Sequence, residues 1–205
     1  MIVIGIDPGL THKDKTSGFS VCKLHVMDQE EKELNTGFLY FDKYIYVKCW
    51  KIINLETDVP MNGYINFIKY VNSHGLNIDN IDVLAMEKQY ISQYSVNLKM
   101  LKFSNGIMGG VAGWFSGKEY KVPEIIEIRP NDKFKIWKDY CTHPLDSKKR
   151  ADKKNNAVDI TMALLKDNKV LLKHLKKFKR DRKWDMADSF LTALTYVHKK
   201  INNPN

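Results

Sequence analysis

The chain has 205 residues, of which 43% are hydrophobic, and it carries a formal net charge of +9. This length and hydrophobic content exclude a disordered chain and predict one domain, residues 1–205, with a substantial core. The excess of lysine and arginine indicates a polyanionic partner, nucleic acid before a membrane surface. The longest apolar run, residues 107–115, is far shorter than the roughly 20 residues that span a bilayer.

The three cysteines are far apart in the sequence and form no CxxC pair, so neither a zinc site nor a disulfide framework is expected. No signal peptide is visible, because a strand-like run at residues 2–6 leads directly into a charged segment. We therefore expect an intracellular protein in a reducing compartment, without membrane association and without a small-molecule cofactor.

The first half of the chain predicts mostly strands. Residues 2–6 form an apolar strand that a proline and a glycine end. Segments 18–24 and 35–41 alternate between apolar and polar residues on either side of a charged tip, which predicts an antiparallel meander of three strands. Residues 42–59 fit either a strand or an amphipathic helix, and we interpret them as an insertion.

The second half alternates helices with two further strands. A helix is predicted over residues 60–75, and a longer one over 92–115 follows a buried strand at 81–87. A last strand at 124–128 precedes several helices, the final one amphipathic over 184–200. This order predicts an α/β fold, a mixed five-stranded sheet with helices on both faces.

Four acidic residues stand where an isolated carboxylate is costly. Asp7 and Glu87 each end an apolar strand, and Asp185 and Asp188 lie three apart at the head of the last helix. Residues three apart lie about 60° from each other around a helix axis, so both can face one point. If the two strands are neighbours, their carboxyl ends place Asp7 beside Glu87.

Such a cluster repels itself unless cations neutralise it. Only oxygen ligands are offered, so the expected cations are hard ones, Mg²⁺ or Mn²⁺. Two such ions about 3.5–4 Å apart would activate a water and stabilise the leaving oxygen in phosphodiester hydrolysis. Taken singly, each acid also fits a structural role in a turn, an exposed ion pair or a helix cap.

The helix predicted over 92–115 carries four glycines whose spacing clears one face, namely Gly106, Gly109, Gly110 and Gly113. Each costs about 1 kcal/mol in helix propensity relative to alanine, so a close approach of another backbone is needed to offset the loss. The residues alone leave tight core packing and a dimer seam as equal alternatives.

Four segments in this order resemble the RuvC-type Holliday junction resolvases of the RNase H-like, retroviral-integrase superfamily. The first two are IGIDPGL and LAMEKQY, which carry the strand-end acids and, in the second, Tyr90. KKRADKKNNAVDITMALL resembles the family's segment in which a lysine precedes a helix, with Lys153 or Lys154 at that position. WDMADSFLTALTYVH is similar to the closing Asp-x-x-Asp-Ala-Leu-Ala helix, with Ser189 where the family usually has alanine.

The resemblance implies a homodimeric, Mg²⁺-dependent endonuclease that cuts four-way DNA junctions by paired, symmetric nicks. The four acids would be the metal ligands, and the glycine-rich helix would form the dimer interface. Lys153 or Lys154 would face the scissile phosphate, and Tyr90 would stack on a base of an opened junction. The basic residues expected to contact DNA are Lys88, Lys148, Lys149, Arg150, Lys176, Lys177, Lys179 and Arg180.

The longer first loop, the insertion over 42–59 and a basic stretch over 166–183 depart from bacterial members and resemble elaborations in phage and large-DNA-virus relatives. The basic stretch predicts salt-dependent phosphate contacts, or else a merely solvated helix. The first loop also resembles the phosphate hairpin of actin-like ATPases, but no second copy follows. The remaining alternatives are an RNase H-like or other branched-DNA nuclease, and a non-catalytic DNA-binding module on the same fold.

Overall fold

A computed structural model describes residues 1–10, 17–29, 35–54, 80–89 and 98–203 of the chain. Within them the strands are β1 (Ile2–Leu10), β2 (Ser17–Met27), β3 (Gly37–Tyr40), β4 (Lys43–Asn54), β5 (Val83–Glu87) and β6 (Glu124–Ile128). The helices are α2 (Leu98–Gly117), α3 (Pro130–Ile136), the short 3-10 helix η2 (Lys138–Tyr140), α4 (Arg150–Leu164), α5 (Lys169–Lys176) and α6 (Arg180–Asn202).

The strands form one mixed sheet in the order β3-β4-β2-β1-β5-β6. β1, β2, β4 and β3 pair antiparallel in succession, whereas β1 with β5 and β5 with β6 are parallel. The predicted α/β fold class is therefore confirmed. The predicted helix over 60–75 and the start of the helix over 92–115 lie outside the described residues.

The sheet differs from the prediction in the number and order of its strands. It has six strands because residues 43–54, which the sequence left open between strand and helix, form β4 next to β2. The predicted third strand therefore lies at the edge as β3 and pairs with β4, not with β2. The pairing of β2 with β4 shifts register between Lys23 and Leu24 of β2, which makes Lys48 an extra residue of β4 at this point. This shift interrupts the alternation of buried residues along β4, so the sequence pattern of residues 43–54 is ambiguous.

The first strand is also longer than predicted, since β1 continues through Pro8 to Leu10. The parallel pairing of β1 with β5 ends at Ile6, while its antiparallel pairing with β2 continues to Leu10. Pro8 lies beyond the residues that pair with β5, so its missing N–H is tolerated there.

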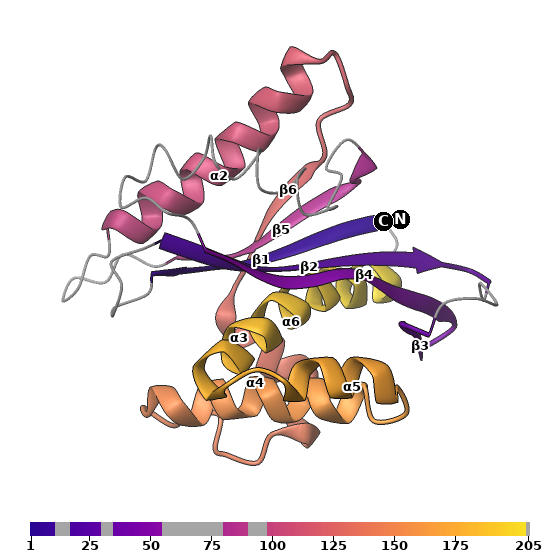
Figure 1. The fold of residues 1–205 in the computed structure, drawn as a ribbon, viewed down its shortest axis with the longest axis vertical. Coiled ribbons are helices and arrows are strands. Elements are labelled where there is room, and N and C mark those ends of the chain that lie inside the picture. The colour runs from indigo at the N-terminus through magenta and orange to yellow at the C-terminus, as the bar shows by residue number, and fades with distance from the viewer. Residues whose placement is uncertain (11–16, 30–34, 55–79, 90–97, 204–205) are drawn as a thin grey trace.

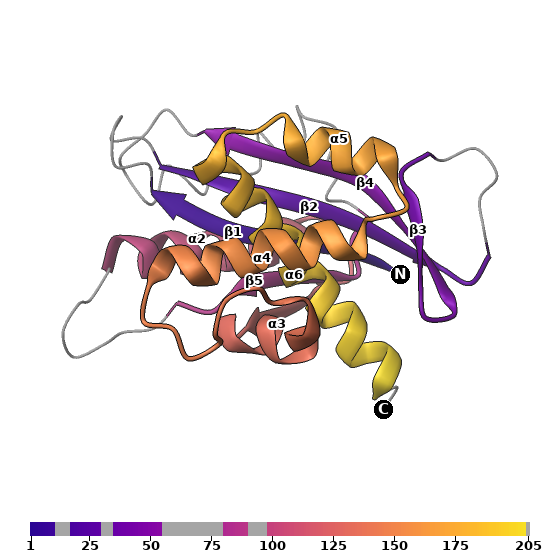
Figure 2. The same cartoon turned by 90° about the horizontal axis from the view of Figure 1, so that it is seen from below.

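Helices cover both faces of the sheet (Figure 1). α2 lies on one face, and α6 lies directly against the other, with α4 and α5 outside it. Figure 2 shows α4 and α5 crossing this second face along the sheet. Among the residues described, none of the helices combines the length and apolar character that crossing a bilayer requires.

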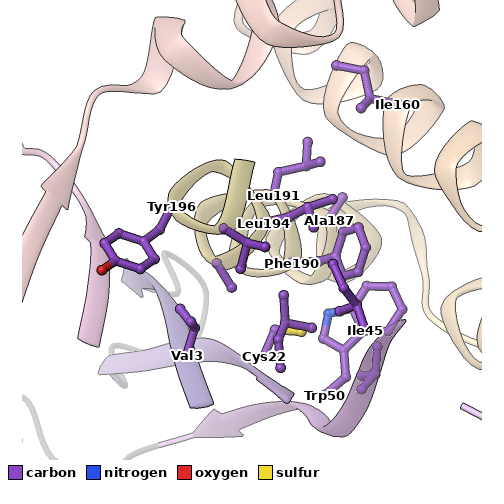
Figure 3. Close-up of a cluster of buried hydrophobic side chains, with 14 of the residues drawn as sticks. Val3, Cys22, Ile45, Trp50, Ile160, Ala187, Phe190, Leu191, Leu194 and Tyr196 are labelled. Carbon is purple, nitrogen blue, oxygen red and sulfur yellow. The ribbon is translucent and has the colours of Figure 1, made fainter. Parts of the chain in front are cut away.

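Alternate residues of β1 belong to the two cores. Val3 packs with the residues on the α6 side, and Ile4 with those on the α2 side. On the α6 side, Figure 3 shows Val3, Cys22 and Trp50 of the sheet facing α6. The Trp50 ring lies 5.3 Å from that of Phe190, and its Nε1 donates to the Met186 carbonyl over 2.8 Å. These contacts fix the helix that carries Asp185 and Asp188.

Gly5 allows β1 and α6 to come this close. A Cβ on Gly5 would lie 2.3 Å from the Ser189 carbonyl oxygen and 2.6 Å from the Ala193 nitrogen, both backbone atoms of α6. Gly5→Ala should therefore lower the free energy of unfolding by about 3 kcal/mol, measured by urea denaturation. The control Gly117→Ala, where a Cβ meets nothing within 4 Å, should be at least as stable as wild type, because alanine has the higher helix propensity. Equal stability of the two variants would contradict this packing.

Candidate active site

Asp7 and Glu87 lie side by side. Ile6 of β1 is paired with Met86 of the parallel strand β5, so the next residues, Asp7 and Glu87, lie where the pairing of these two strands ends. Asp7 is 6% exposed, and Glu87 is partly buried. This is the arrangement that the two apolar strands predict.

Asp188 of α6 joins them through two lysines. Lys133 of α3, which is 1% exposed, donates to Asp188 Oδ1 over 2.8 Å and to Glu87 Oε2. Lys154 of α4 donates to Asp188 Oδ2, and its Nζ lies 3.7 Å from Asp7 Oδ2. Three carboxylates and two ammonium groups from five separate elements thus share one buried cluster, which we name the carboxylate–lysine cluster.

Asp185 lies at the margin of this cluster. It is half-buried, and its Oδ2 is 3.9 Å from the Arg182 guanidinium. Burial raises its pKa, and Lys154 and Asp188 are near enough to act on that pKa in opposite directions. Asp185 therefore shares the electrostatic environment of Asp188, as the spacing of the two residues predicts, but no described lysine forms a salt bridge with it.

The two most buried carboxylates respond in opposite ways. Burial raises the pKa of Asp7 well above its usual value, and the ammonium of Lys154 offsets this only in part. Burial also acts to raise the pKa of Asp188, but Lys133 and Lys154 outweigh it and lower that pKa to about 2. Asp188 therefore stabilises the fold above its unfolded pKa of 3.8, and loses that contribution as the pH falls from there through about 2.

The donor set fits a hard divalent cation. It consists of carboxylate oxygens, and the two lysines of the carboxylate–lysine cluster face three carboxylates, which leaves one negative charge. The ammonium nearest to Asp7 is that of Lys154, at 3.7 Å, and Lys154 also donates to Asp188. Among the described residues, no group of three or more His, Cys, Asp or Glu side chains is placed to hold a metal. The carboxylates of the cluster are instead paired with ammonium groups.

The structure distinguishes the two candidate lysines of α4. Lys154 points into the cluster, whereas the neighbouring Lys153 is exposed. Lys88 is half-exposed and pairs with Glu127 over 3.4 Å. Tyr90 lies outside the described residues. The other predicted DNA-binding residues are exposed at the start of α4 and around α5, namely Lys148, Lys149, Arg150, Lys176, Lys177, Lys179 and Arg180.

The glycines of α2 separate into two groups. Gly110 is buried and Gly106 partly so, on the side with Ile107 and Val111, which pack in the sheet core. Gly109 and Gly113 are exposed, and a Cβ on Gly109 would meet nothing within 4 Å. Core packing accounts for Gly110, but packing within the described part of this chain leaves Gly109 and Gly113 unexplained.

Sequence reasoning missed Lys133. A lysine in a short, polar helix is expected to be exposed, and nothing in the pattern of residues 130–136 distinguishes it from Lys135. Its burial follows from tertiary structure, because α3 directly follows β6, the strand next to β5, and packs against α6. The one feature of the sequence that points to a buried lysine is the set of four acids, which needs cations to neutralise it.

Solved structures show what the fold is. The chain resembles Thermus thermophilus RuvC with a TM-score of 0.53 and 13% identity, covering 98% of this chain and 96% of that one. It also resembles T. thermophilus RuvC in complex with Holliday junction substrate, with a TM-score of 0.55 and 13% identity, covering 99% of this chain and 97% of that one. The resemblance to the yeast mitochondrial Holliday junction resolvase Ydc2 has a TM-score of 0.56 and 17% identity, covering 97% of this chain and 78% of that one.

No family model and no curated protein matches the sequence. The chain nevertheless has a RuvC-type fold over almost its entire length, as the resemblance of its four segments implied.

The position of Lys133 between two carboxylates predicts that it contributes to the free energy of unfolding. Lys133→Met removes the cation between two buried carboxylates and should cost about 3–5 kcal/mol of unfolding free energy, measured by urea denaturation near pH 7. Lys135→Met, an exposed position on the same helix, should have an effect below about 0.5 kcal/mol. If the two variants were equally stable, Lys133 would not neutralise the cluster.

Proposed function

We propose that this protein is a structure-specific endonuclease that resolves four-way DNA junctions by paired, symmetric nicks. The observation that carries the proposal is the convergence of Asp7, Glu87 and Asp188 on Lys133 and Lys154 at one edge of a RuvC-type sheet. The solved structures named above include a RuvC bound to Holliday junction substrate, which supports branched DNA as the ligand.

Asp7, Glu87, Asp185 and Asp188 would hold Mg²⁺, with Mn²⁺ as a substitute. A pair of bound ions supplies an activated water and stabilises the charge on the leaving oxygen of the phosphodiester. Lys154 is the residue of this chain that would bind a non-bridging oxygen of the scissile phosphate, because it lies at the less buried side of the cluster. Lys133, almost fully buried, would keep Glu87 and Asp188 oriented.

Phosphate contacts outside the site would come from the exposed basic residues at the start of α4 and around α5. Since they are exposed and numerous, their contribution to affinity should be largely electrostatic and independent of sequence. Junction binding should therefore weaken steeply as salt is raised.

The experiment that tests the function offers the purified protein a four-way junction, a linear duplex and an RNA–DNA hybrid, each with Mg²⁺ or EDTA. We expect symmetric nicks in the junction with Mg²⁺ and no cutting with EDTA. Cleavage of the hybrid alone would assign an RNase H-like activity instead. Binding without cleavage of any substrate would assign a non-catalytic DNA-binding module.

Asp7→Asn and Glu87→Gln should each reduce junction cleavage by at least about 100-fold, because each removes a negative ligand from the cluster. Junction affinity, measured by gel shift in Ca²⁺, should change little. The matched control is Asp167→Asn, which changes an exposed acid between α4 and α5 and should cut normally. A normal cleavage rate in either cluster variant would show that the site lies elsewhere.

We also propose a homodimer with the exposed glycine face of α2 at its centre. Gly109 and Gly113 leave room on this helix for a second backbone, and paired nicks need two sites. Light scattering at micromolar concentration should give twice the 23.9 kDa mass of the chain. Gly109→Glu should halve the measured mass, whereas Lys169→Glu on α5 should not. A monomeric mass for the wild type would contradict the dimer.

A further inference from the structure

A pocket lies between α4 and the first turns of α6, the helices that carry Lys154 and Asp188. Its volume is about 420 Å³. The two helices contribute most of its wall, and the segment before α4 closes one side with Thr142 and His143. The helix residues that line it and bear on its chemistry are Asn155, Asp159, Arg180, Lys183 and Trp184.

This pocket adjoins the proposed catalytic residues on both helices. Asn155 follows Lys154 on α4, and Trp184 precedes Asp185 on α6. Neighbouring residues on a helix point about 100° apart, so the same two helical turns present the cluster on one face and the pocket on the next. A DNA strand with a phosphate at Lys154 would therefore pass the mouth of this pocket with a nearby nucleotide.

The wall of the pocket offers one donor and one acceptor that are unused. Asn155 Oδ1 accepts from the Trp184 indole N–H over 3.1 Å, which fixes the amide and directs its Nδ2 away from the indole. Asp159 Oδ2 accepts from the Thr142 hydroxyl. In the described part of the chain, neither Asn155 Nδ2 nor Asp159 Oδ1 has a hydrogen-bond partner.

The mouth of the pocket is cationic and aromatic. The Arg180 guanidinium lies over the Trp184 ring, 4.6 Å from its centroid, which restrains a long side chain that would otherwise be mobile. Lys183 lines the same pocket, and neither it nor Arg180 forms an ion pair with any described residue. Two cations with no acidic partner at an opening beside the cluster are suited to a phosphate group.

We propose that this pocket receives one unpaired nucleotide of the DNA strand next to the phosphate held at the cluster. Its base edge would accept from Asn155 Nδ2 and donate to Asp159 Oδ1, and its phosphate would bind Arg180 and Lys183. Every base carries donors and acceptors side by side on its pairing edge, and these are free only when the base is unpaired. The inference rests on the proposed junction substrate and adds an extrahelical nucleotide to it.

The test uses 2-aminopurine, whose fluorescence rises when the base leaves the stack. It is placed in turn at each nucleotide near the cut in a four-way junction, and binding is measured in the non-cutting Asp7→Asn background with Ca²⁺. We expect a rise at one position. Asn155→Ala combined with Asp159→Asn should abolish it, while Asp167→Asn, the same acid-to-amide change on an exposed residue, should not.

Cleavage gives a second, independent readout in chains that retain Asp7. The same double change should slow cutting of the intact junction by about tenfold. It should have no effect on a junction that lacks the base at the responding position, because no base edge remains to be bound. If the double variant does not fold, Asn155→Asp alone replaces the free donor by an acceptor at constant shape and should give the same pattern.

The proposed binding of a nucleotide in the pocket would be contradicted if the fluorescence rise persisted in the pocket variants. It would also be contradicted if no position gave a rise. Equal slowing on intact and abasic junctions would also overturn it, since the effect would then be structural. These outcomes are separate from failure of the proposed function. A protein that binds junctions without cutting them would contradict the nuclease, and the fluorescence measurement would still test the pocket.

Discussion

The pairing of three converging carboxylates with two ammonium groups, one buried and one partly buried, holds this end of the molecule together. Asp7 and Glu87 come from the sheet, Asp188 from α6, and the cations from α3 and α4. Removing charges from water costs several kcal/mol for each ion, so such a cluster depends on the opposite charges placed within it. Burial raises the pKa of Asp7, and the Lys154 ammonium offsets this only in part.

The fold supplies the rigidity that this arrangement needs. α6 lies against the sheet over its buried stretch, anchored by Trp50 and by the close approach at Gly5, so the position of Asp188 is set by the core. Lys133 and Lys154 come from helices that pack on α6. The site is therefore built on regular elements, which suits chemistry that depends on sub-ångström placement of charges.

Much of this site could be predicted from sequence, because an acid that ends an apolar strand is costly to desolvate unless a cation neutralises it. The spacing of Asp185 and Asp188 also predicted their common side of α6. The burial of Lys133 could not be predicted, because the sequence pattern of α3 does not distinguish it from the exposed Lys135. β4 could not be assigned either, because a register shift breaks its alternation, and the choice of Lys154 over Lys153 needed the orientation of α4. An origin in a phage or large DNA virus, and an intracellular location, stay predictions.

The proposed metal site requires Asp7 and Asp188 to bind a divalent cation, and the Lys154 ammonium to move from its position beside both carboxylates. It is tested most directly by a crystal of the wild-type protein soaked in Mn²⁺, with the anomalous signal of manganese used to locate the ion. We expect a peak within coordination distance of Asp7 and Asp188, with the Lys154 ammonium displaced from its position between them. Manganese bound elsewhere, with Lys154 still paired to both carboxylates, would contradict the claim.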